Sequence, residues 1–308
     1  MPQTCLLIGA PLDCGKRRQG CLMGADALRT AGLAPALEAL GHSLEDLGNV
    51  TPDATPEIPH ENPNLHALAE TVGWTSALMR TAEEASAQGT PIFMGGDHAL
   101  SAGTVAGVAA HAKTLGQPQF LLWLDAHTDY HTPASTTSGH LHGTSFAYVT
   151  GRAGFEAFPK LPAPIPLQNT CLMGLRSVDP AEHQGLIDGP AQITDMRGID
   201  EHGIKRPLTA FLEKVRAANG RLHVSLDVDF LDPSIAPAVG TTVPGGATIR
   251  EAHLVMELLH DAGCVTSLDI VELNPFLDER GKTASLLVDL TASLMGRRVF
   301  DRPTRSFA

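Results

Sequence analysis

The segment of residues 119–143, QFLLWLDAHTDYHTPASTTSGHLHG, begins as an apolar run and ends in many groups that can bind a metal ion or transfer a proton. The run QFLLWL contains no charged residue, which is typical of a parallel strand with both faces buried. Six carboxylate and imidazole side chains follow it: Asp125, His127, Asp129, His131, His140 and His142. The segment therefore predicts a buried strand with a polar site at its carboxyl end.

Apolar segments of the same kind recur along the chain, separated or followed by longer amphipathic segments. Strands are predicted at residues 4–11, 91–96, 119–125, 170–175, 221–229 and 264–273, and helices at 24–41 (ending at Gly41), 65–89, 248–263 and 283–296. A Pro-rich link is expected at residues 51–63. Repeated strand–helix alternation predicts an α/β fold with a parallel sheet covered by helices on both faces. Since no shift in composition divides the chain, residues 1–308 are interpreted as a single domain.

The overall composition restricts the partners and the compartment. Hydrophobic residues make up 43% of the 308 residues and charged residues 18%, which favours a well-buried core over disorder. A formal net charge of −12 argues against nucleic acid and anionic membrane surfaces as partners. Five scattered cysteines without a CxxC pair indicate reduced thiols in a cytoplasm. We expect neither a signal peptide nor a membrane span.

Three predicted strands end in the same kind of chemistry. The motifs are GGDHAL at residues 95–100, DAHTDY at 125–130 and SLDVDFLDP at 225–233. Ligands of open parallel sheets bind outside the carboxyl ends of the strands, so these side chains are expected to converge. In the last two motifs the ligand types recur at every second residue, which in extended chain places them on one face.

The converging carboxylates predict two metal ions. Any close pair among Asp125, Asp129, Asp227 and Asp229 would repel by about 4 kcal/mol at an effective dielectric constant near 20. No lysine or arginine lies within the motifs to offset this repulsion. Oxygen-rich ligation with neutral imidazoles favours hard divalent ions such as Mn²⁺ over Zn²⁺. The alternative is structural: Asp97 and Asp232 would only cap turns or helices, and a lone histidine would be a hydrogen-bonded core residue.

In this order the three motifs resemble the metal-binding motifs of the ureohydrolase family, the arginases, agmatinases and their relatives. The resemblance extends from LIGAP (7–11) through GLRSVDP (174–180) to ELNPF (272–276). It implies an eight-stranded parallel sheet, two Mn²⁺ ions per chain and a homo-oligomer, a trimer or hexamer. It assigns one ion to His98, Asp125, Asp129 and Asp227, and the other to His127, Asp125, Asp227 and Asp229. Asp125 and Asp227 would bridge the two ions.

Such a site suits attack on a guanidinium carbon, because a water that bridges two metal ions becomes hydroxide near neutral pH. Asp129 is expected to accept the proton that this water releases. By resemblance, Glu272 is the carboxylate that faces the substrate's guanidinium, and Thr241 lines the site. The alternative for Glu272 is a helix-capping or buried ion-pair carboxylate.

The remainder of the opening segment, residues 131–143, resembles the arginase loop that binds the α-carboxylate of the substrate. The resemblance implies that Thr136 and Ser138 contact this carboxylate, and it makes His142 the proton shuttle, a role that suits an imidazole at physiological pH. His131 and His140 stand where most arginases have Asn. His131 is still able to donate to a carboxylate, but its larger side chain could change the size or direction of the pocket. Alternatively, both histidines are only loop residues at the mouth of the site.

The segment GLRSVDPAEH carries the residues expected near the α-amino group, Asp179 and Glu182. Their alternative is a structural role as carboxylates at a helix N-terminus. The leading prediction is hydrolysis of L-arginine to L-ornithine and urea. The alternatives are a ureohydrolase for another guanidino compound (a guanidino acid or agmatine), a single-metal deacetylase on a related sheet, and a catalytically silent homologue.

Overall fold

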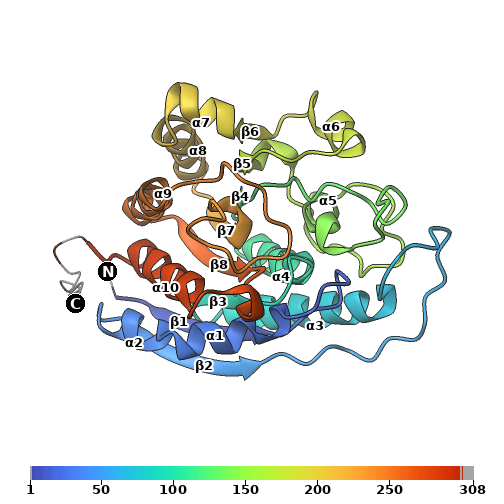
Figure 1. The fold of residues 1–308 in the computed structure, drawn as a ribbon, viewed down its shortest axis with the longest axis horizontal. Helices are drawn as coiled ribbons and strands as arrows, with labels where there is room; N and C mark the ends of the chain where they lie inside the picture. The colour runs from blue at the N-terminus through green and yellow to red at the C-terminus, as the bar shows by residue number, and fades with distance from the viewer. Residues whose placement is uncertain (1, 299, 301–308) are drawn as a thin grey trace.

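The computed structural model, which describes residues 2–298 and 300, is built around one eight-stranded parallel sheet (Figure 1). The strand order is β2-β1-β3-β8-β7-β4-β5-β6, and every neighbouring pair is parallel. The strands are β1 (Thr4–Ala10), β2 (Ser43–Asn49), β3 (Thr90–Gly95), β4 (Gln119–Leu124), β5 (Thr170–Leu175), β6 (Gln192–Asp195), β7 (Arg221–Asp227) and β8 (Val265–Val271).

The strand β4 explains why the central runs are apolar throughout. Successive side chains of a strand point to opposite faces of the sheet. Phe120, Leu122 and Leu124 pack into the core on one face, whereas Leu121 and Trp123 pack into the core on the other. Because both faces are covered, no position of β4 is left for a polar residue except Gln119 at its start.

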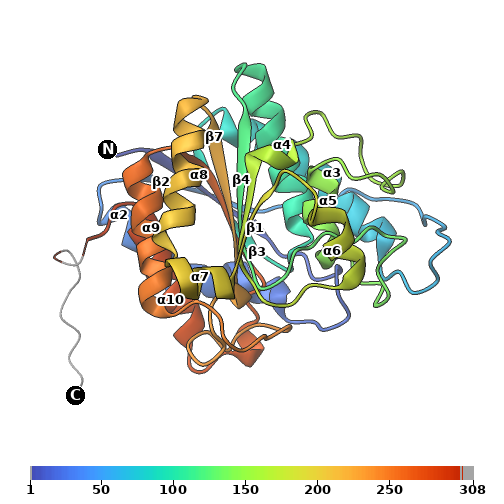
Figure 2. The ribbon, with the colours of Figure 1, turned by 90° about the horizontal axis from the view of Figure 1, so that it is seen from above.

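Helices cover both faces of the sheet (Figure 2). One face carries α1 (Gly24–Thr30), α2 (Leu33–Glu38), α7 (Met196–His202), α8 (Lys205–Ala217), α9 (Ile249–Ala262) and α10 (Lys282–Leu294). The opposite face carries α3 (Leu68–Ser86), α4 (Leu100–Thr114), α5 (Ser145–Val149) and α6 (Pro180–Leu186). The predicted single α/β domain with an eight-stranded parallel sheet and helices on both faces is therefore confirmed.

Two details of the predicted organisation are wrong. The helix expected over residues 24–41 is two helices, because Gly32 adopts a left-handed conformation (φ 89°) that ends α1 and begins α2. Neither edge strand, β2 nor β6, is predicted from the apolar pattern. Most of their side chains lie outside the core, so they lack the continuous apolar run that marks the inner strands.

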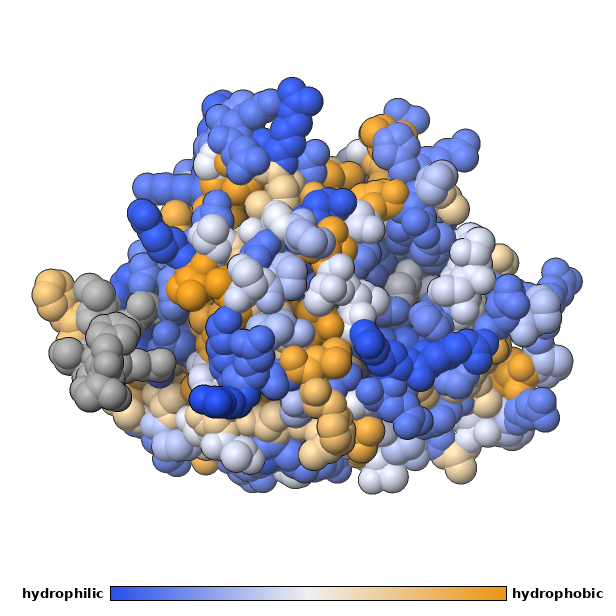
Figure 3. All heavy atoms as spheres, in the orientation of Figure 1, coloured by the Kyte–Doolittle hydropathy of each residue, from blue (hydrophilic) through white to orange (hydrophobic). Residues whose placement is uncertain are grey.

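The sheet order brings together the three strand ends that carry the metal motifs and the end of β8, which leads into Glu272. The strands β3, β8, β7 and β4 are consecutive neighbours at the centre of the sheet, and their carboxyl ends lie on the same edge. The face drawn in Figure 3 is largely hydrophilic, with its hydrophobic residues in separate patches. Within residues 2–298 and 300, no helix combines the length and apolar character required to cross a bilayer.

Candidate metal centre

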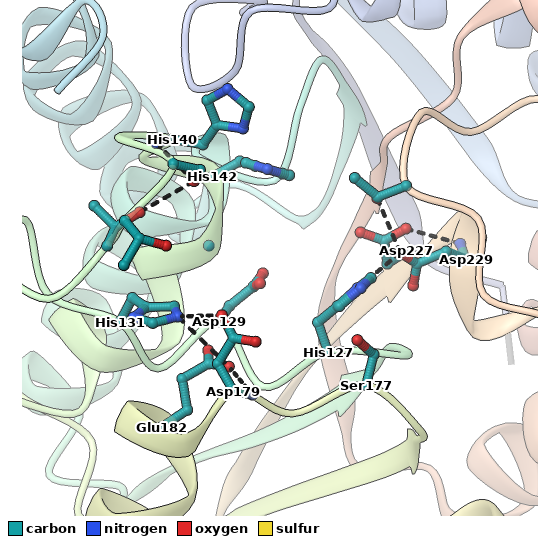
Figure 4. A pocket seen from close by; sticks show the side chains of 15 residues that line it. His127, Asp129, His131, His140, His142, Ser177, Asp179, Glu182, Asp227 and Asp229 are labelled. Carbon is teal, nitrogen blue, oxygen red and sulfur yellow. Dashed lines mark hydrogen bonds and ion pairs between the residues drawn. The ribbon is translucent and has the colours of Figure 1, made fainter. Parts of the chain in front are cut away.

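Most of the predicted site residues line a cavity of about 280 Å³ outside the carboxyl ends of the central strands (Figure 4), whereas His98, Asp125 and Glu272 are buried behind its lining. His98 follows β3, the segment from Asp125 to Asp129 follows β4, Asp227 is the last residue of β7, and Asp229 follows it. The described residues that line the cavity are His127, Asp129, His131, Thr136, Thr137, Ser138, His140, His142, Gly143, Ser177, Asp179, Glu182, Asp227, Asp229 and Thr241. The expected convergence of the strand ends is therefore present.

The first group of possible metal ligands surrounds the ring of His98. Its Nδ1 lies 3.0 Å from carboxylate oxygens of Asp129 and Asp227 and 3.1 Å from one of Asp125. The ring is held from behind, because Nε2 lies 2.8 Å from the hydroxyl of Ser225. It also stacks on the indole of Trp123, with a centroid separation of 4.2 Å. The orientation of Nδ1 toward the carboxylates is thus fixed by the surrounding core.

The second group surrounds His127. Its Nδ1 lies 3.0 Å from Asp229 Oδ2 and 3.4 Å from Asp125 Oδ1. Asp125 therefore contributes one oxygen to each group, an arrangement that suits a carboxylate shared by two cations. Asp227 contacts only the His98 side through Oδ2, while its Oδ1 accepts the backbone N–H of Asp229 at 2.8 Å.

The charges of this cluster fit two cations. His98 Nδ1 and Asp129 Oδ2 are buried and have no hydrogen-bond partner among the described residues. Burial alone would lower the pKa of both imidazoles, but the carboxylates outweigh it. They raise the pKa of His98 well above its ordinary value and that of His127 to about 12. The negative charge of the carboxylates therefore favours a nearby positive charge. Divalent ions fit this site better than protons on the imidazoles, because metal ions are bound by neutral imidazole.

The ligands are positioned by turns rather than by extended chain, so that part of the prediction is wrong. After β4, Asp125 Oδ1 accepts the backbone N–H of His127 at 2.7 Å. Two residues further, Asp129 has a left-handed backbone (φ 46°). The short helix that follows β7 brings Asp229 beside Asp227. Side-chain hydrogen bonds to the following backbone therefore turn each motif back toward the cavity.

Five residues of the loop 131–140 line the cavity opposite the His127 ligand group (Figure 4), namely His131, Thr136, Thr137, Ser138 and His140. His131 is fixed at both ring nitrogens: Nδ1 lies 3.0 Å from Ser135 Oγ, and Nε2 lies 3.1 Å from Asp179 Oδ2. The hydroxyls of Thr136 and Ser138 lie 3.2 Å apart. The six predicted substrate-binding residues all line this one cavity: His131, Thr136, Ser138, Asp179, Glu182 and Thr241.

Glu182 and Asp179 also have the structural role named as the alternative. They form a capping box at the start of α6. Glu182 accepts the backbone N–H of Asp179 with Oε2 (3.0 Å) and that of Tyr130 with Oε1 (2.9 Å). The side chain of Asp179, 64% exposed, is the more accessible of the two carboxylates.

Glu272 lies beneath the cavity wall, and its side chain is completely buried. Its Oε1 lies 3.0 Å from Nδ1 of His142, and its Oε2 forms an ion pair with Lys16. The contact with Lys16 matches the buried ion-pair alternative, and Glu272 is absent from the cavity-lining residues given above. Sequence reasoning missed Lys16, although it follows β1 at the same edge of the sheet as the motifs.

Asp97 and Asp232 have the structural roles given as their alternative. Asp97 accepts the backbone N–H groups of Gly15 (2.8 Å) and Ala99 (3.0 Å). Asp232 accepts those of Ser234, Gly245 and Gly246. Neither residue belongs to a possible metal-ligand group among the described residues.

The end of the Pro-rich link and the residue after it, Asn62 and Asn64, hold the loop at the cavity, a role that nothing in their sequence indicates. Asn62 donates from its side-chain amide to the carbonyls of Pro133 and Thr136, both at 2.9 Å. Asn64 donates in the same way to Thr137 at 3.2 Å. At Gly139, which has a φ of 74°, an added Cβ would lie 1.8 Å from the Asn64 carbonyl oxygen. The close fit of the two segments therefore requires glycine there.

Comparisons with known proteins agree with this site. The Arginase family model matches residues 3–296. The chain is 59% identical to an arginase of Brucella melitensis over 304 residues, which cover 98% of this chain and 99% of that protein. It is similar to the native arginase structure from Bacillus caldovelox, with a TM-score of 0.88 and 35% identity, and to Entamoeba histolytica arginase in complex with L-ornithine, with 0.85 and 26%. Each structural match covers 96% of this chain and 99% of the other.

Proposed function

The chain belongs to the arginase family of hydrolases, and we propose that it hydrolyses L-arginine to L-ornithine and urea. The observation that carries this proposal is the single cavity between the His127 ligand group and the hydroxyl-rich loop. Two further findings support it: the identity to the Brucella arginase and the likeness to an arginase that binds L-ornithine.

We propose two Mn²⁺ ions as the cofactors of this reaction. The ligands would be His98, Asp125, Asp129 and Asp227 for one ion, and His127, Asp125, Asp227 and Asp229 for the other. The predominance of carboxylate oxygen supports a hard ion, and the buried Nδ1 of His98 without a hydrogen-bond partner supports a cation beside it. When bound, two such ions would lower the pKa of water and polarise the substrate.

The amino-acid end of arginine is assigned to the loop side of the cavity. The hydroxyls of Thr136 and Ser138 are able to donate to the α-carboxylate, and Asp179 and Glu182 offer negative charge to the α-ammonium group. His131 links these two regions, since it lies in the loop and contacts Asp179. Thr241, whose hydroxyl lies 3.3 Å from Asp229 Oδ2, lines the side of the ligands.

Proton transfer is assigned to Asp129 and His142, and Glu272 supplies a negative charge beside them. Asp129 accepts a proton from the attacking water, because its carboxylate both lines the cavity and contacts His98. His142 delivers a proton to the departing amine from Nε2, since Nδ1 is engaged by Glu272. The negative charge of Glu272 is assigned to the side of the cavity where the guanidinium of the substrate would bind. Glu272 would contact the substrate directly only by releasing Lys16 or His142.

We also propose a cytoplasmic location and a homo-oligomer, a trimer or hexamer. The location is supported by the cysteines, because all five are free in the described structure and four of them are buried. The oligomer rests on the resemblance to ureohydrolases.

The proposal is tested by urea release from L-arginine with added Mn²⁺ and after chelation. Agmatine and 4-guanidinobutyrate serve as matched substrates, since agmatine lacks the α-carboxylate and 4-guanidinobutyrate lacks the α-amino group. We expect rapid release from L-arginine only, and only with metal. Equal rates with agmatine or 4-guanidinobutyrate would contradict the assignment of the loop.

A further inference from the structure

A lysine is buried beside the cavity. Lys16 lies in the loop between β1 and α1, its side chain is 2% exposed, and its ammonium pairs with Oε2 of Glu272. Burial alone would lower the pKa of Lys16, but the Glu272 carboxylate outweighs it and holds the pKa well above the usual value. Lys16 is therefore a fixed positive charge inside the protein.

The carboxylate of Glu272 connects this charge to His142. Its Oε1 accepts the backbone N–H of His98 at 2.9 Å and lies 3.0 Å from Nδ1 of His142. The backbone of Glu272 is left-handed (φ 68°), and its N–H donates to the Gly96 carbonyl at 2.8 Å. A carboxylate only accepts hydrogen bonds, so the proton of this contact lies on Nδ1 and leaves Nε2 for the cavity.

The loop that carries Lys16 also holds the backbone of the histidine. The Gly15 carbonyl accepts the N–H groups of Leu141 (2.7 Å) and His142 (3.1 Å). One short loop therefore holds His142 in two ways. Gly15 binds the main chain of His142, and Lys16 contacts the His142 ring indirectly through Glu272.

We infer that Lys16 is a positioning residue, which locks Glu272 so that the His142 ring presents Nε2 to the substrate. This inference rests on the proposed arginine hydrolysis, in which His142 transfers the proton. Without the ammonium, Oε2 of a buried carboxylate would lose its charged partner. The carboxylate would then turn away from its present position, and the ring with it.

The first test compares Lys16→Met with the matched control Arg18→Met in the Mn²⁺-loaded protein. Arg18 is an exposed cation of the same loop, and it donates to the Gly240 carbonyl instead of Glu272. We expect Lys16→Met to lower kcat about 10-fold or more, part of the 10²–10⁴-fold typical of a positioned proton donor. KM and bound Mn²⁺ should stay within twofold, and Arg18→Met should match the wild type in all three. Unchanged kcat, a raised KM alone or lost metal in Lys16→Met would each overturn the inference.

A double-mutant cycle tests the route through Glu272 and remains informative if Lys16→Met alone fails to fold. Glu272→Gln and Lys16→Met/Glu272→Gln remove one charge and both charges of the pair. If Lys16 acts only through Glu272, the second substitution should change kcat less than twofold in the Glu272→Gln background. A further fall of tenfold would overturn the inference.

The ring itself gives a measurement that is independent of turnover. ¹⁵N spectra of the protein loaded with a diamagnetic divalent cation, with the His142 signals assigned by their loss in His142→Asn, report which nitrogen carries the proton. We expect Nδ1–H in the wild type and its loss in Lys16→Met. The same Nδ1–H signal in both proteins would contradict the role of Lys16. An absence of urea release by the wild type would instead refute the proposed function.

Discussion

Nδ1 of His98 and Oδ2 of Asp129 lie 3.0 Å apart in the core, and neither atom has a hydrogen-bond partner among the described residues. Polar atoms buried in this way normally cost folding free energy, about 1–3 kcal/mol for each unsatisfied group. The Asp125 and Asp227 carboxylates beside them add negative charge. A cation between the imidazole and the carboxylates would satisfy all of these groups at once.

Asp125→Asn should remove more than one equivalent of Mn²⁺ per chain, because Asp125 contributes an oxygen to both ligand groups. Metal analysis after dialysis measures this loss. Asp53→Asn, which only breaks an exposed pair with Arg80, is the control and should retain both ions. Two tightly bound ions in Asp125→Asn would show that this carboxylate is not shared.

His142→Asn should lower kcat by about 10²–10⁴-fold, the usual contribution of a positioned proton donor, since the amide has no titratable nitrogen. His142 belongs to no ligand group among the described residues, so the Mn²⁺ content should not change. Steady-state urea release from pH 7 to 9 measures the effect. A variant as fast as the wild type over this range would exclude His142 as the donor.

L-Arginine should be preferred over agmatine by roughly 10²-fold or more in kcat/KM, since agmatine leaves the hydroxyl donors assigned to the α-carboxylate, the buried Thr136 and the exposed Ser138, without their partner. Ser138→Ala should reduce arginine turnover and leave agmatine turnover nearly unchanged. His131→Asn should keep arginine as the best substrate. If Ser138→Ala slows both substrates equally, the hydroxyl does not contact the carboxylate.

Asp232 should stabilise the fold at neutral pH and lose this effect in acid. The Ser234 hydroxyl, together with the backbone N–H groups of Ser234, Gly245 and Gly246, lowers the pKa of Asp232 to about 2 from an ordinary 3.8. Its stabilising contribution is therefore complete above pH 4 and disappears as the pH falls toward 2. In urea unfolding, the wild type should have a higher free energy of unfolding than Asp232→Asn at pH 5, and this difference should be smaller at pH 2.5. A difference in unfolding free energy that does not change with pH would mean that the fold does not favour the ionised form of Asp232.

The sequence predicts the inner strands and the metal motifs because burial leaves a strong local signal there. β4 is apolar at nearly every position, and its motif repeats ligand types. The edge strand β2 lacks that signal, since none of its side chains is fully buried. The left-handed backbone at Asp129 depends on contacts across the fold, such as the Ala147 N–H to its carbonyl. No local pattern encodes these contacts.

Lys16 is harder to find for a related reason. It stands about 250 residues before its partner Glu272, and a lone lysine in a loop normally indicates solvent exposure. Its burial follows only once β1, β3 and β8 are known to be neighbours.

The contacts of Asn62 and Asn64 with residues 133–137 affect how this enzyme could be re-engineered. The loop at the cavity is not a self-contained module, because its shape is held by amides that lie about 70 residues earlier in the chain. Transplanting residues 131–140 from a relative with another substrate would combine a new loop with the original Asn62 and Asn64, whose contacts fit the original loop. A working graft would have to move both segments together, and directed libraries would gain most from varying them as one unit.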